Sequence, residues 1–167
     1  MDKVITTALL IVVSMIMAVS LFNVAYPAIV QGGDAIASMA DRADDRIRSQ
    51  ITVIHAAAEW QDGAPLDMNA SGDIEAYVWV KNVGDTRIAA VERVDVFFGQ
   101  EGNFARIPHA SESMAGTYWQ ASFDNGSEWT PTATLRITIH HAPLQAGRQF
   151  VKIVAPNGVA DEYFWSL

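Results

Sequence analysis

The chain has four histidines and no cysteine, which limits the metal and nucleophile chemistry that it can carry. Without cysteine, disulfides, thiolate metal sites and cysteine nucleophiles are excluded. His140 and His141 are adjacent, and neighbouring side chains on a strand point to opposite faces, so we expect that they do not share a metal ion. His55 and His109 show no ligand spacing. The sequence therefore predicts no metal ligand and no cofactor.

Motifs of enzyme active sites are also missing from the sequence. It has no G-x-S-x-G nucleophile elbow, no H-E-x-x-H zinc motif and no glycine-rich phosphate loop. The acidic residues, including Asp161 and Glu162, do not have the spacing of an EF-hand. We predict that the protein has no catalytic residue and is not an enzyme.

Two sites for covalent modification are indicated by short patterns. Asn69-Ala70-Ser71 and Asn125-Gly126-Ser127 fit N-x-[ST], the acceptor of N-linked sugar. Such a pattern occurs often by chance, but both examples fall in predicted surface loops. The sequence predicts Asn69 and Asn125 as candidate positions for N-linked glycans.

The overall composition restricts the class of protein. The chain has 167 residues, 50% of them hydrophobic and 18% charged, which argues against intrinsic disorder and suggests one domain with an appendage. Its formal net charge of -8 argues against a nucleic-acid partner, because phosphate recognition requires clustered Lys and Arg.

The N-terminal segment carries the strongest signal. Residues 4–33 contain no charge, and residues 4–25 are almost wholly apolar. As a helix, residues 4–25 would extend ~33 Å, enough to cross a hydrocarbon core of ~30 Å. The apolar core of a secretory signal is only ~7–15 residues long, so we expect a retained membrane span instead.

Beyond this span, the apolar spacing predicts that the helix continues to residue 58. An apolar stripe with steps of three or four residues faces one side, and charged residues face the other. The predicted helical region is therefore 1–58, followed by a connector at 59–72. Pro27, Gly32 and Gly33 are candidate hinge positions within the helix.

A change in amino-acid composition, toward β-branched and aromatic residues, marks the start of the C-terminal domain, which is predicted at 73–167. Apolar and polar residues alternate near 74–81 and 132–139, the period of a half-buried strand. Further strands are predicted near 94–98, 118–123, 150–154 and 159–165, and residues 156–158 (PNG) form a hairpin signal. The predicted fold class is α+β, a long N-terminal hydrophobic helix followed by an antiparallel immunoglobulin-like β-sandwich.

This layout resembles that of archaeal flagellins (archaellins) within the type IV pilin-like family. The resemblance is carried by the apolar helix at 4–30, and by residues 80–84 (VKNVG), 94–99 (VDVFFG) and 151–159 (VKIVAPNGV). Ile5 stands where pilins usually carry a glutamate, which favours archaellins. The resemblance implies a structural subunit that is held in the cytoplasmic membrane, passes through an assembly platform and polymerises with many copies of itself. The product would be an extracellular helical filament used for swimming.

In such a filament, the helices would form the core and the sandwiches the outer shell. The expected core residues are Val4, Ile5, Leu9, Leu10, Val12, Val13, Ile16, Met17, Leu21, Phe22, Ile36, Ala40, Ala43, Ile47, Ile51 and Ile54. Three alternatives remain open: an accessory archaellum protein that anchors the motor in the envelope, an adhesive type IV-like pilin, and a single-span membrane protein with a ligand-binding sandwich.

Overall fold

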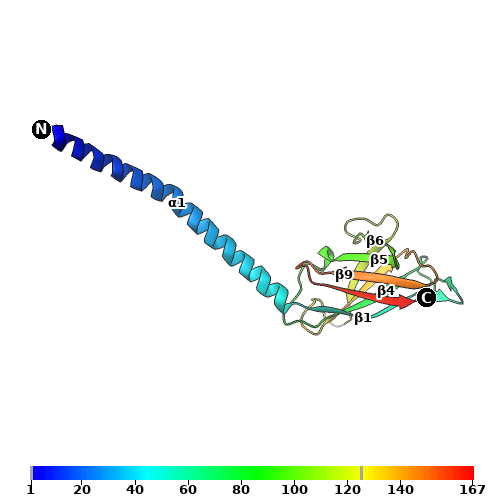
Figure 1. Cartoon of the computed structure of the whole chain (residues 1–167). Coiled ribbons are helices and arrows are strands. Elements are labelled where there is room, and N and C mark those ends of the chain that lie inside the picture. Colours follow the sequence, from blue (N-terminus) through cyan, green and yellow to red (C-terminus); the bar gives the residue numbers. More distant parts are fainter. Residues whose placement is uncertain (1, 125) are drawn as a thin grey trace. The chain divides into compact units, whose positions relative to one another are not determined.

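The helix α1 (Asp2–Arg48) forms the N-terminal part of the chain (Figure 1). The computed structural model describes residues 2–124 and 126–167. It divides into two units, with the boundary between Ala43 and Asp44, and each unit is treated by itself below. Every residue from Lys3 to Arg48 is solvent-exposed, so the apolar face of α1 is unpartnered in the single chain.

The helix runs without a break through Pro27, Gly32 and Gly33. These residues therefore do not interrupt it, and their role as a hinge stays a prediction.

Two of the few polar side chains in the apolar segment are satisfied by the helix itself. The Thr7 hydroxyl donates to the carbonyl of Lys3 at 2.8 Å, and the Ser14 hydroxyl donates to the carbonyl of Ile11 at 3.2 Å and to that of Leu10. Such back-bonding makes these side chains compatible with a lipid environment.

The predicted helix end at residue 58 is wrong. The helix ends at Arg48, and β1 (Ile51–Ala58) is the first strand of the sandwich. Ile51, Val53 and Ala56 are buried in the sandwich core, and the β1 backbone pairs with β4. The apolar residues keep a spacing of three or four residues beyond the end of the helix at Arg48, which led to the wrong prediction. In the fold, burial in the sandwich and pairing with β4 outweigh this local helical preference. The sandwich thus begins at residue 51, not at 73.

Two four-stranded antiparallel sheets form the sandwich (Figure 1). The first has strand order β1-β4-β8-β7, with the remaining bounds β4 Ala76–Asn82, β8 Thr134–His140 and β7 Tyr118–Phe123. The second has strand order β10-β9-β5-β6, with bounds Ala160–Ser166, Arg148–Val154, Asp95–Gln100 and Asn103–Ile107. The predicted connector contains the small hairpin β2 (Trp60–Gln61) and β3 (Ala64–Pro65), and a 3-10 turn, η1, spans Val91–Arg93.

Alternating apolar residues of the two sheets meet in one core. The largest fully buried side chains include Trp119, Trp129, Phe98, Leu135 and Ile137. At one edge of the sandwich, the two sheets are joined by a hydrogen bond between β1 and β10. The Val53 amide on β1 donates to the Asp161 carboxylate on β10 at 2.7 Å. These contacts confirm the predicted fold class of one long helix followed by antiparallel sheets.

Candidate functional site

The predicted core residues of a filament fall into two groups. Those from Val4 to Ile47 lie on α1 and are exposed, which leaves them available to lipid or to another chain. Ile51 and Ile54 lie on β1 instead, and Ile51 is buried in the sandwich. The structure therefore corrects the assignment of Ile51 and Ile54 to the helix.

The last turn of α1 is attached to the sandwich mainly through backbone hydrogen bonds. The amides of Val83 and Gly84 donate to the carbonyl of Gln50 at 2.9 and 3.0 Å, and the amide of Asp85 donates to the carbonyl of Arg48 at 2.9 Å. A Cβ atom at Gly84 would lie 2.5 Å from the Gln50 nitrogen and 2.6 Å from the Arg48 oxygen. Only glycine at position 84 permits the two backbone segments to lie this close. We call these two segments, residues 48–50 and 83–85, the junction.

Asn82 holds the loop of the junction from inside the sandwich. Its side chain is fully buried, and its Nδ2 donates to the carbonyls of Thr86 and Trp129 at 2.8 and 3.1 Å. Its Oδ1 accepts from the Gly84 amide at 3.0 Å. Because a buried amide without partners is costly, these bonds specify the path of the loop.

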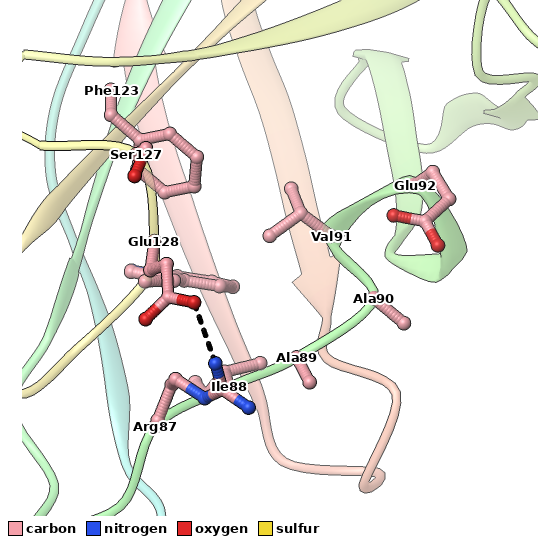
Figure 2. A pocket seen from close by; sticks show the side chains of 10 residues that line it. Arg87, Ile88, Ala89, Ala90, Val91, Glu92, Phe123, Ser127 and Glu128 are labelled. Atoms are coloured by element: carbon pink, nitrogen blue, oxygen red, sulfur yellow. Dashed lines mark hydrogen bonds and ion pairs between the residues drawn. The ribbon is translucent and has the colours of Figure 1, made fainter.

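A surface pocket of about 260 Å³ lies beside this loop, between residues 87–92 and the segment that leads to Trp129 (Figure 2). Arg87 and Glu128 form an ion pair of 2.7 Å across it, and Val91 and Phe123 line its apolar part. Both charged side chains are more than half exposed, so the pair contributes little to stability. Among the described residues that line it, Ser127 is the only hydroxyl and no histidine is present to activate it.

A second polar site, which we call the His140 cluster, consists of Asp73, Glu75, His140 and His141. The Nδ1 atom of His140 lies 3.0 Å from Asp73 Oδ2 and 3.0 Å from Glu75 Oε1. The Nδ1 atom of His141 lies 3.8 Å from the same Asp73 oxygen. The donor atoms of Asp73, Glu75 and His140 all lie within 4.8 Å of one another, a spacing suited to a metal ion.

The sheet register explains why these residues meet. Ala76 on β4 pairs with Ile139 on β8, so Glu75 and His140, the next residues outward, become neighbours across the two strands. Tyr118 on β7 pairs with His140, and the two rings stack with centroids 4.8 Å apart. The cluster is therefore positioned by three strands of one sheet.

Further hydrogen bonds hold the outer oxygens of both carboxylates. Ser71 Oγ donates to Asp73 Oδ1 at 2.7 Å. Asn69 Nδ2 donates to Glu75 Oε2 at 2.8 Å, and the Tyr77 hydroxyl also donates to that oxygen. Each carboxylate thus has one oxygen fixed from outside and the other directed at His140.

These contacts shift two pKa values. Burial raises the pKa of Tyr77 to about 12, with a further contribution from its hydrogen bond to Glu75. Burial also raises the pKa of Asp73, but hydrogen bonds from Ser71 and His140 and the attraction of the His140 charge outweigh it. The pKa of Asp73 consequently lies below its ordinary value.

The structure contradicts the expectation for the adjacent histidines and leaves the two predicted glycan acceptors untested. His141 follows the last residue of β8 and has a left-handed backbone (φ 51°), so strand alternation does not apply and both imidazoles lie near Asp73. Asn69 is exposed, as predicted, but its Nδ2 donates to Glu75 and Tyr77. Asn125 lies outside the described residues.

Asp73 and Glu75 are site residues that the sequence did not predict. Their spacing with Tyr77 (i, i+2, i+4) places all three on one face of an extended segment, which was the available signal. Recognising the cluster also required the pairing of β4 with β8, residues more than fifty positions apart.

Comparison with known proteins gives a fold likeness. No model of a protein family matches the chain. An uncharacterized protein of Archaeoglobus fulgidus is 24% identical over 172 residues, covering 97% of both chains. The structure of the archaellum periplasmic stator protein FlaG from Sulfolobus acidocaldarius matches with a TM-score of 0.54 and 23% identity, over 70% of this chain and 99% of that one. One chain in the structure of the archaellum periplasmic stator protein complex FlaF and FlaG from the same organism matches with a TM-score of 0.52 and 24% identity, over 70% of this chain and 88% of that one. The chain is therefore similar in fold to archaellum stator proteins over 70% of its length.

Proposed function

We propose that this protein is a membrane-anchored accessory protein of the archaellum, of the stator type, and not the subunit of the filament. The observation that carries the proposal is the fold likeness, which extends over 99% of the stator protein FlaG. This corresponds to the alternative of an accessory protein in the sequence analysis. It takes the place of the filament subunit as the main hypothesis.

The helix α1 supports an anchored position. Its hydropathy and length suit a membrane span, and the apolar segment is fully exposed in the chain. Lys3 directly precedes the apolar segment, and no further basic residue follows until Arg42. The positive-inside rule therefore favours the cytoplasmic side for Lys3 and the outer side for the sandwich. In this arrangement lipid covers residues 4–25, and the protein does not need a polymer to bury them.

The expected partner is a second archaellum protein. The likeness to a complex of two different stator proteins supports a hetero-complex in the envelope over a homopolymer. A stator acts mechanically, by holding against the torque of a rotating part, so this function requires no catalytic residue.

The location and copy number of the protein test this proposal. Sheared filaments and washed membranes from the source organism would be compared by quantitative mass spectrometry, with the major filament protein as the internal reference. We expect the chain in membranes, at far fewer copies than the filament protein. Its recovery as the main component of sheared filaments would restore the filament-subunit hypothesis.

A motility assay tests the link to the archaellum. A deletion strain is expected to lose swimming, and expression of the full chain from a plasmid should restore it. Normal swimming by the deletion strain would contradict a stator function and favour a membrane protein unrelated to motility.

A further inference from the structure

We propose that the His140 cluster binds one divalent transition-metal cation of the zinc type. The ligands are Asp73 Oδ2, Glu75 Oε1 and His140 Nδ1, which lie within 4.8 Å of one another. The imidazole of His141, whose Nδ1 lies 3.8 Å from Asp73 Oδ2, would complete the set after a rotation of its side chain. The proposal concerns the sandwich alone and does not depend on a function in the archaellum.

The first argument is the distance between donor atoms. Zinc bonds of about 2.0–2.1 Å in a tetrahedron place neighbouring ligand atoms roughly 3.3–3.4 Å apart. His140 Nδ1 lies 3.0 Å from both carboxylate oxygens, and His141 Nδ1 lies 3.8 Å from Asp73 Oδ2. Shifts of a few tenths of an ångström would bring these pairs to the distances of a bound ion.

The second argument is the set of outer hydrogen bonds. Metal-binding carboxylates are commonly held by additional hydrogen bonds that fix their orientation. Here Ser71 holds the outer oxygen of Asp73, and Asn69 with Tyr77 holds the outer oxygen of Glu75. The remaining oxygen of each carboxylate faces the imidazole of His140, whose plane is set by stacking on Tyr118. A simple ion pair with histidine would not require this support on both carboxylates.

The third argument is charge in a partly dry site. The side chains of Asp73 and Glu75 are 11% and 7% exposed, and in the part of the chain that the structure describes no Lys or Arg forms an ion pair with either of them. Buried carboxylates require compensation. The two ionised carboxylates carry a charge of about -2, which one divalent cation balances.

The mixed donor set indicates the class of metal. Imidazole nitrogen together with carboxylate oxygen suits zinc and neighbouring transition metals, whereas calcium and magnesium prefer oxygen ligands alone. A pocket of about 290 Å³, lined by Gly72, Tyr118, His141 and the other cluster residues, opens at the site and gives an ion access.

Metal titration of the purified full chain in detergent, without a polyhistidine tag and after removal of metals by a chelator, tests the proposal. We expect saturable binding of one Zn²⁺ per chain and a rise of several degrees in the unfolding temperature of the sandwich. Co²⁺ used as a spectroscopic probe should give the visible absorption of a tetrahedral site.

Matched variants separate this site from other histidines. Glu75→Gln and His140→Gln should each weaken Zn²⁺ binding by tenfold or more. His55→Gln is the control, because His55 lies on β1 against Trp79, outside the cluster, and its loss should leave binding unchanged. Circular dichroism would verify that each variant is folded.

X-ray absorption of the zinc-loaded wild type provides a readout that needs no variant, and two imidazole ligands are expected. The proposal fails if the wild type shows no saturable Zn²⁺ binding, or if folded Glu75→Gln and His140→Gln proteins bind as tightly as the wild type. It also fails if the absorption spectrum contains no imidazole ligand. In those cases the cluster is only a hydrogen-bonded group.

Discussion

The helix α1 and the sandwich use the same apolar residues in opposite ways. Ile16 on α1 is 61% exposed, whereas Ile137 on β8 is completely buried. Full burial of such a side chain contributes about 1.5–3 kcal/mol. The sandwich obtains this stabilisation from its own chain, while α1 obtains it only from lipid or from another protein. The sandwich can thus bury its apolar residues within its own chain, whereas the apolar residues of α1 require lipid or another protein to cover them.

The comparison is tested most strongly by the same truncation in both regions. Ile137→Ala should lower the free energy of unfolding of the sandwich by about 2–5 kcal/mol, because it leaves a cavity in a fully buried position. Ile16→Ala should leave that free energy unchanged. Denaturant unfolding of the full chain in detergent, followed by Trp fluorescence, measures both values. Equal losses for the two variants would refute the division of the molecule into independent regions.

A charge in the apolar segment should affect location and not folding. Ile16→Asp places a carboxylate within the proposed membrane span, at a cost of roughly 2.5–3.5 kcal/mol for insertion. We expect less protein in the membrane fraction and an unaltered unfolding transition of the sandwich. Ile47→Asp is the control, since Ile47 lies in the exposed last turn of α1, beside Arg46 and Arg48. Full membrane retention of the Ile16→Asp protein would contradict a spanning role.

A substitution at the junction should give a smaller effect. Gly84→Ala forces its Cβ against the backbone of residues 48–50, and relief of that overlap should cost about 1–3 kcal/mol. Gly32→Ala is the matched control, because nothing lies within 4 Å of a Cβ at that position. Thermal unfolding and amide exchange at residues 83–85 measure the difference. Unchanged exchange in Gly84→Ala would show that the close approach is not required.

The ion pair of the surface pocket should give the smallest effect. Arg87→Ala removes the contact with Glu128, and exposed pairs contribute about 0.2–1 kcal/mol. We expect a shift in unfolding free energy below 1 kcal/mol that decreases further at high salt. A loss comparable to that of Ile137→Ala would mean that this pocket stabilises the sandwich in a way that its exposure does not indicate.

The sequence predicted those parts of the fold whose pattern is local. The alternation in β4 and β8 follows from their half-buried position, and the apolar part of α1 follows from uninterrupted apolar residues. Strand β1 was missed because its apolar residues continue the helical spacing, and only pairing with β4 reveals it. Strand β6 was missed because it lies at a sheet edge with only Ile107 buried, so it has no alternation.

The His140 cluster was missed for a related reason. Its residues come from a loop, from the residue before β4 and from the end of β8, and their proximity depends on strand register. Conformation at a single residue also mattered, because the left-handed backbone of His141 alters the direction of its side chain. Neither property is encoded in a local spacing rule.

The hydrogen bonds of the junction have a consequence for sequence divergence. Its three main contacts join amides and carbonyls of the backbone, which every residue except proline supplies. The side chains at positions 48, 50, 83 and 85 are therefore free to change over evolutionary time without loss of these bonds, whereas Ser49 is buried and its hydroxyl lies 2.6 Å from that of Thr86. Purifying selection should fall on Gly84 for its size, on Asn82 for its three hydrogen bonds and on Ser49 for its buried hydroxyl. Random mutagenesis of residues 48–50 and 82–85, followed by selection for folded protein, would retain Ser49, Asn82 and Gly84 and few other residues.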